Sequence, residues 1–267
     1  MTIEESTKWI YTLLELDHKV VGIKFLFDKG EYDLFPAKEH THRMSYCTVV
    51  KKASDGECQK VRQDHQACPG GSVALGFTKP NDDNISGRRR YLQKTYCNMG
   101  ISRKVSKNMV YCEHTLYGIA VMPLEKYDIE PDVVIIVCNP FNAMRISQGY
   151  AYKYGHIENI KFAGMQAICQ ECTSLPYEND QLNISMLCSG TRMLGRWRED
   201  ELAVGMPFRY LLDIVEGIKN TVNPLERNKN KKIIEKKLID NQLNGQLEIL
   251  FNENYDDNIY QGGKVEK

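Results

Sequence analysis

The sequence predicts an α/β or α+β fold in which a mixed central sheet is flanked by helices. Residues 20–27 form an apolar, β-branched run that follows a helical pattern, so the chain opens with a helix and then a strand. Residues 132–138 are continuously apolar, which is typical of a central strand covered on both faces. At 267 residues the chain suits one large core, so we expect a single domain over residues 1–222. Residues 223–267 are expected to form a C-terminal helical extension and a disordered tail.

Caps, turn residues and helical spacing predict the other elements. Ser6 can cap a first helix that ends near residues 17–18. A short helix over 44–53 carries Cys47, and the turn formed by Cys68, Pro69 and two glycines opens a second helix, because proline favours a first helical turn. In chain order, the later elements are that helix at 72–77, a helix at 88–100, a strand at 117–124, the strand at 132–138 and a helix at 141–154 closed by Gly155. They are followed by a strand that runs into a turn at Cys188, a strand or turn at 202–206, a helix from Pro207 to Lys219 and a helix at 226–241.

The charge balance argues against whole classes of partner. The chain has 35 basic and 35 acidic residues, so no global field attracts nucleic acid or an anionic membrane. No apolar run approaches the roughly 18 residues of a membrane span, and the acidic N-terminus lacks the features of a signal peptide. We therefore expect a cytoplasmic protein whose partner is a small-molecule substrate or a redox protein. Assembly into a homo-oligomer stays open.

Cysteine is the residue type that stands out. Nine cysteines are many for a cytoplasmic chain, and an odd number cannot pair fully within one molecule. A reducing compartment also disfavours structural disulfides. Each thiol is therefore a buried apolar filler, a nucleophile or a metal ligand, and burial is the commonest fate of free cysteine.

Four cysteines, in three places along the chain, have a setting that suits thiolate chemistry. Cys68 stands before a proline at a predicted helix start, where a thiolate is favoured. Cys188 ends a predicted strand in a Cys-Ser-Gly turn, with Arg192 near enough to compensate a thiolate charge. Cys169 and Cys172 have the two-residue spacing of zinc and iron–sulfur ligands, but a second such pair is absent from the sequence. Any four-ligand site must therefore combine scattered positions.

A set of motifs is spread over roughly residues 20–218. They are the strand at 20–27, Cys47, Cys68-Pro-Gly-Gly followed by Leu75-Gly-Phe, Pro131-Asp-Val-Val, Asn139-Pro, Ala143-Met, Gly164-x-Gln-Ala-x-Cys169, Asn183-x-Ser, Cys188-x-Gly-x-Arg192, and Glu201 with Val204-Gly-Met-Pro207. In these motifs the chain resembles the uncharacterised ArCR family of archaea and anaerobic bacteria. This resemblance implies no established activity. It does bring four thiols forward, Cys47, Cys68, Cys169 and Cys188, which is the number that a cubane cluster or a structural zinc requires.

The leading hypothesis is that these four cysteines hold a 4Fe–4S cluster with a redox or substrate-binding role. The abundance of lysine, asparagine and isoleucine beside free thiols suits an anaerobe. Structural zinc on the same ligands is a second hypothesis. A third is a metal-free enzyme with Cys68 or Cys188 as nucleophile and His65 or His114 as base. The fourth is a small-molecule binding domain in which the cysteines are apolar fillers and the pocket lies at Asn139 to Arg145, with Asn142 in its wall. The expected substrate contacts are Asn139, Arg145 and Arg192.

Overall fold

The computed structural model describes residues 2–221, and within them a seven-stranded mixed sheet organises the chain. The strand order is β2-β3-β4-β1-β5-β7-β6. β2 and β3 are parallel and every other neighbouring pair is antiparallel, so the predicted mixed sheet is confirmed. The strands are β1 (Val21–Leu26), β2 (Lys38–Glu39), β3 (Gln59–Arg62), β4 (Gly118–Pro123), β5 (Val133–Cys138), β6 (Asn183–Ser185) and β7 (Leu202–Pro207).

The interior strand β5 shows how the sheet is packed on both faces. It pairs with β1 on one side and with β7 on the other, and all of its residues are buried. Because side chains alternate across a strand, Val133, Ile135 and Val137 join one hydrophobic core. Val134, Ile136 and Cys138 join a second core on the opposite face. The continuous apolar run therefore reflects burial on both faces, as predicted.

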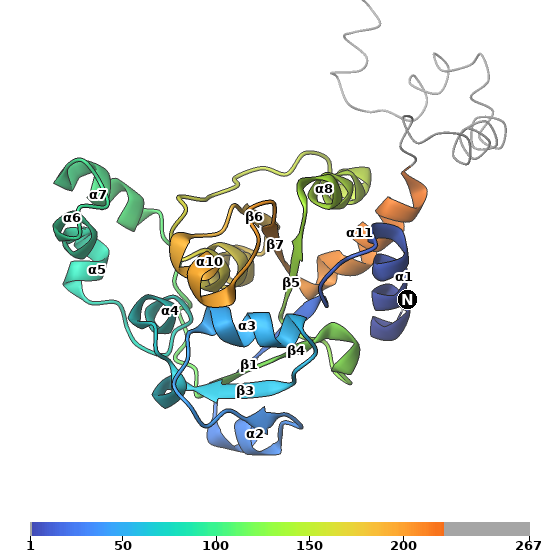
Figure 1. Ribbon diagram of the computed structural model, residues 1–267, viewed down its shortest axis with the longest axis horizontal. Helices are drawn as coiled ribbons and strands as arrows, with labels where there is room; N and C mark the ends of the chain where they lie inside the picture. Colours follow the sequence, from blue (N-terminus) through green and yellow to red (C-terminus); the bar gives the residue numbers. More distant parts are fainter. Residues whose placement is uncertain (1, 222–267) are drawn as a thin grey trace, which may run out of the picture. The chain divides into compact units, whose positions relative to one another are not determined.

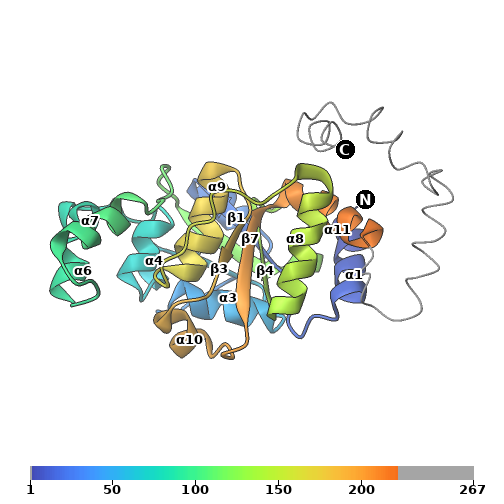
Figure 2. The same cartoon turned by 90° about the horizontal axis from the view of Figure 1, so that it is seen from above.

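Helices cover both faces of the sheet (Figures 1 and 2). Figure 2 shows α1, α8 and α11 on one side of β7, with α4, α9 and α10 on the other. The small helices α6 and α7 lie beyond α4 in both views. The helices are α1 (Ile3–Leu14), α2 (Lys29–Leu34), α3 (Tyr46–Ser54), α4 (Pro69–Ala74), α5 (Asp82–Ser86), α6 (Arg88–Leu92), α7 (Met99–Lys107), α8 (Pro140–Tyr154), α9 (Leu175–Asn179), α10 (Ser189–Gly195) and α11 (Phe208–Asn220), with short 3₁₀ turns η1 (Gln63–His65) and η2 (Leu124–Lys126) and a π-helix η3 (Ala167–Ser174).

Several predicted boundaries need correction. α1 begins at a capping box formed by Thr2 and Glu5, whereas Ser6 lies inside the helix and donates to the Ile3 carbonyl. The helix predicted over 88–100 is two helices, because Asn98 caps a new one at α7. The predicted helix at 226–241, the extension at 223–267 and its tail lie outside the described residues. No helix among residues 2–221 has the length and apolar character to cross a membrane.

Candidate thiol site

Four cysteines from four separate elements meet on one face of the sheet. Cys47 lies in the first turn of α3, Cys169 lies in the π-helix η3, and Cys68 and Cys188 are the N-caps of α4 and α10. Burial raises the pKa of the Cys169 thiol well above its usual range. The neighbouring thiols that raise it further are those of Cys47, Cys68 and Cys188. A Cβ atom on Gly71 would stand 3.8 Å from the Cys68 Cβ and 3.9 Å from the Cys169 Cβ, and the Thr191 hydroxyl lies beside the sulfurs of Cys47 and Cys188. We call these four neighbouring cysteines the thiol site.

The two N-cap cysteines have the same local geometry. The Cys68 sulfur accepts a hydrogen bond from the Gly71 amide at 3.5 Å, and the Cys188 sulfur accepts one from the Thr191 amide at 3.4 Å. In both segments glycine occupies the second helical position, as Gly70 and Gly190. A sulfur acceptor at the N-cap takes the place that a hydroxyl or carboxylate oxygen usually fills.

Thr191 connects two of the thiols. Its Oγ1 lies 3.1 Å from the Cys47 sulfur and 3.2 Å from the Cys188 sulfur, and the residue is fully buried. α10 packs on α3, which brings these side chains together although they are 144 residues apart. Each sulfur of this pair therefore has a hydroxyl neighbour, and that contact lowers the pKa of Cys47 against the larger opposite effect of burial.

Burial divides the thiols into two pairs. Cys47 and Cys169 are 9% and 4% exposed, whereas Cys68 and Cys188 are partly accessible. Burial raises the pKa of Cys47 to about 12. The two buried thiols are therefore neutral at pH 7 in the absence of metal, and a metal that binds them must displace their protons.

The backbone around the thiol site is irregular. The π-helix η3 widens the turn that carries Cys169, and such helices are rare and frequently mark functional sites. Two residues with positive φ flank the cysteines, Gln166 before η3 and Leu187 before Cys188. Positive φ is costly in residues other than glycine and persists where the surroundings hold it in place. The backbone is therefore strained at the residue that precedes η3 and at the residue that precedes Cys188.

A glycine in β7 lets η3 lie against the sheet. A Cβ atom on Gly205 would stand 2.3 Å from the Cys172 carbonyl oxygen, which no side chain permits. Next to this contact, the buried Glu171 carboxylate accepts hydrogen bonds from the Ser185 hydroxyl and, at 2.8 Å, from the Ala163 amide. Burial raises the pKa of Glu171. These contacts hold the π-helix in place behind the thiols.

Sequence reasoning missed two members of this neighbourhood. Cys172 is fully buried, and nearby Cys47 and Cys188 contribute to raising its pKa, after burial and Glu171. The two-residue spacing between Cys169 and Cys172 was the sequence signal for Cys172, but Cys172 lies outside the motifs that resemble the family. Thr191 carried a weaker signal, because a hydroxyl three residues after an N-cap cysteine is common at any helix start.

The two histidines predicted as possible bases are His65 and His114. His65 Nε2 is 3.9 Å from Glu39 Oε1, and its Nδ1 faces the Arg62 amide at 3.4 Å. No hydrogen bond joins His65 or His114 to Cys68 or Cys188 in the described part of the chain. Across residues 2–221, no three histidine, cysteine, aspartate or glutamate side chains are arranged to hold a single metal ion.

Two of the predicted substrate contacts lie on the opposite side of the sheet. Asn139 is the N-cap of α8 and accepts a hydrogen bond from the Asn142 amide at 2.9 Å. Arg145 is buried in the same helix, where its guanidinium donates to Gln148 Oε1 and to the Ile218 carbonyl of α11. Their observed contacts organise helix ends and helix packing, and their binding of a substrate stays a prediction.

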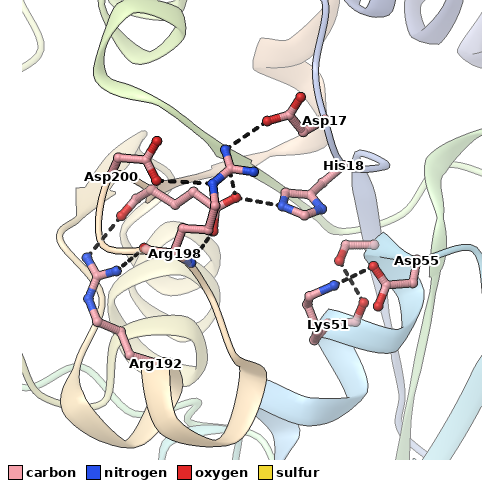
Figure 3. A network of polar contacts seen from close by, with 9 residues as sticks. Asp17, His18, Lys51, Asp55, Arg192, Arg198 and Asp200 are labelled. Carbon is pink, nitrogen blue, oxygen red and sulfur yellow. Dashed lines mark hydrogen bonds and ion pairs between the residues drawn. The ribbon is translucent and has the colours of Figure 1, made fainter.

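Arg192 supports the loops that flank α10 (Figure 3). Its guanidinium donates to the Met186 carbonyl at 2.9 Å, to the Glu201 carbonyl at 3.0 Å and to the carbonyl of Arg198. The Glu201 carboxylate in turn faces His18 Nε2 at 2.6 Å. Arg192 therefore fixes the segment that leads into Cys188, and a direct contact with substrate stays a prediction.

Comparisons with known proteins agree with the motifs. A family model described as Uncharacterised ArCR matches residues 10–217. A protein of the archaeon Methanocaldococcus jannaschii, named only as uncharacterized, is 25% identical over 222 residues, which cover 82% of this chain and 94% of that protein. No solved structure matches the chain.

Proposed function

This chain belongs to the uncharacterised ArCR family, and we propose that it binds a 4Fe–4S cluster through Cys47, Cys68, Cys169 and Cys188. One observation carries the proposal: four cysteines from distant parts of the chain lie near one another, Cys47 and Cys188 beside the Thr191 hydroxyl and Cys68 and Cys169 beside Gly71. Soft thiolates select iron–sulfur clusters and zinc over hard cations. When bound, such a cluster would supply one-electron transfer, or a Lewis acid if one of the four cysteines left its iron open.

Structural zinc on the same four thiols stays the alternative. A tetrahedral zinc with bonds of about 2.3 Å draws its sulfurs to within about 4 Å of one another. In a cubane cluster each thiolate binds a different iron, so the four sulfurs stand farther apart. Within residues 2–221 no three histidine, cysteine, aspartate or glutamate side chains are arranged to hold a metal ion, so metal analysis decides between the two.

Hydrogen-bond donors around the sulfurs also support the proposal. The Gly71 and Thr191 amides and the Thr191 hydroxyl are directed at cysteine sulfurs. Donors of this kind stabilise the negative charge of bound thiolate and tune the reduction potential of a cluster. The partly accessible Cys68 and Cys188 mark the side from which a substrate or a redox partner approaches.

The setting of the protein is part of the same proposal. An exposed iron–sulfur centre survives in the cytoplasm of an anaerobe, and the balanced charge of the chain provides no field for nucleic acid or membrane lipid. The partners are accordingly a small-molecule substrate or a redox protein.

The test is metal analysis with an absorption spectrum on the full chain purified without oxygen. We expect broad absorption near about 400 nm with matching iron and sulfide. Cys169→Ser and Cys188→Ser should lose both the absorption and most of the iron. Cys138→Ser is the matched control, because Cys138 is buried on the opposite face of the sheet, and it should keep the full iron content.

Other outcomes identify the competing functions. Zinc in place of iron, lost in the same two variants, would make the protein a structural zinc module. A colourless, metal-free protein in which Cys68 alone reacts with an alkylating agent would favour the thiol nucleophile. Equal iron content in Cys138→Ser and Cys169→Ser would reject the thiol site as the binding site.

A further inference from the structure

A cavity of about 200 Å³ opens beside Cys68. Cys68, Pro69 and Gly70 form one wall, and Met165 and Gln166, which precede η3, form another. The remaining wall comes from α5 and α6. Its members are Asp83, Asn84, Arg89, Arg90 and Gln93. The cavity is therefore continuous with the thiol site at Cys68 and suits a small molecule.

One charged residue in this wall is buried without an opposite charge. Arg90 is 9% exposed. Its guanidinium donates to the Ser106 hydroxyl at 3.0 Å and to the side-chain carbonyl of Gln166, and both of these partners are neutral. No ion pair joins Arg90 to a carboxylate within residues 2–221. Arginine stays charged under all physiological conditions, so burial does not neutralise it.

An unpaired buried charge is costly, and a bound anion removes that cost. Gln166 holds the guanidinium at the cavity and is itself fixed, because its Nε2 donates to the Gly70 carbonyl at 2.7 Å. Arg89 lines the same cavity from the surface and also lacks an ion pair in the described part of the chain. Asp83, the one carboxylate in the wall, is 3.5 Å from Arg88.

We propose that this cavity binds a small oxyanion, a carboxylate or a phosphate, with Arg90 as the main contact and Arg89 as the second. A planar guanidinium matches both classes of anion through paired N–H donors. The inference rests on the proposed function in one respect, which is that the anion then lies beside the cysteine-held cluster and is its substrate. Anion binding itself depends on the cavity alone.

The experiment is calorimetric titration of the full chain with inorganic phosphate and, separately, with acetate at constant ionic strength. Both titrations are run on iron-loaded and on metal-free protein. We expect saturable binding of at least one probe. Arg90→Gln should weaken it about tenfold or more, as loss of a charge-assisted contact does. Arg89→Gln should weaken it less. Arg103→Gln, an exposed arginine of α7 outside the cavity, should leave it unchanged.

Each result has a clear reading. Binding of phosphate alone or of acetate alone identifies the class of anion, and binding of both assigns a general oxyanion site. Circular dichroism shows whether Arg90→Gln folds, and Arg89→Gln provides the test if it does not. Absence of saturable binding, or equal binding in wild type and a folded Arg90→Gln, overturns the inference. Binding to colourless, metal-free protein would uphold the anion site even where the iron–sulfur proposal fails.

Discussion

The two faces of the sheet are built differently. On the face opposite the thiol site, α1, α8 and α11 are regular helices of 12, 15 and 13 residues that pack through an apolar core. On the thiol face, α3, η3, α9 and α10 have only 9, 8, 5 and 7 residues. That face also holds the π-helix and the strained residues Gln166 and Leu187.

This difference indicates that one face of the sheet contributes most of the packing, while the other face positions the thiols. Short elements bring many helix starts close together, and a helix start exposes amide groups that can face a sulfur. Long helices bury more apolar surface and contribute stability through packing. We therefore expect substitutions on the regular face to change the free energy of unfolding, and substitutions on the thiol face to change metal binding.

The largest effect of a single substitution on stability is expected at Gly217 in α11. A Cβ there would stand 2.1 Å from the Gly149 carbonyl oxygen of α8, so Gly217→Val should force the two helices apart. We expect a loss of about 3 kcal/mol in the free energy of unfolding, measured by urea denaturation of the metal-free protein. Ala151→Val, exposed on α8, controls for a β-branched residue in a helix. A change of iron content per folded Gly217→Val molecule would break the comparison of the two faces.

A second effect comes from pH. Burial raises the pKa of Cys47 and of Cys138 to about 12, while an unfolded thiol ionises near pH 8.5. Stability is therefore complete below about pH 8.5 and is lost as pH rises toward the folded pKa, by about 1.4 kcal/mol per pH unit for each buried thiol. Denaturation of metal-free protein between pH 7 and 10 measures this loss.

The same pH series on iron-loaded protein tests whether Cys47 is a metal ligand. Loading should abolish the share of the pH dependence that belongs to Cys47, because a metal-bound thiolate carries no proton. The share of Cys138 should persist in loaded protein and disappear in Cys138→Ser. An unchanged pH dependence on loading would show that iron binds elsewhere.

The smallest effect is expected at Thr191. Thr191→Val removes the hydroxyl shared by Cys47 and Cys188 and should lower the stability of the metal-free protein by about 1 kcal/mol. It also removes a contact that lowers the pKa of Cys47, so iron should pass to a chelator faster than in wild type. Thr191→Ser keeps the hydroxyl and should restore both properties. Equal behaviour of the two variants would deny the hydroxyl any role.

Regular elements were the predictable part of the fold. The strands at β1, β4, β5 and β7 and the helices at α8 and α11 follow from apolar runs, proline starts and Gly155. β3 escaped prediction because it reads Gln-Lys-Val-Arg, and Lys60 becomes buried by donating to the Tyr32 and Phe35 carbonyls. These hydrogen bonds join residues that are far apart in the sequence, so no local sequence pattern predicts them.

For the thiol site, the sequence named candidate residues but could not give their geometry, and their role as ligands stays a prediction. The motifs brought four cysteines forward, and helix-start chemistry indicated that Cys68 would be an N-cap. The π-helix leaves no periodic signal, so the position of Cys169 beside Cys47 could not be derived. Cys172 and Thr191 joined the neighbourhood through packing between elements far apart in the chain.

Because the residues of the thiol site are far apart in the sequence, they become available one after another during protein synthesis. Proteins are made from the N-terminus and fold as their segments become available. Cys47 is synthesised early, but Thr191 follows it by 144 residues, and the β7 glycine against which η3 rests comes later still. A ribosome must therefore complete almost the whole domain before the four sulfurs can meet. A metal that the thiol site binds would therefore be delivered after most of the domain is made, and a chain that stops short of β7 lacks the strand on which η3 rests.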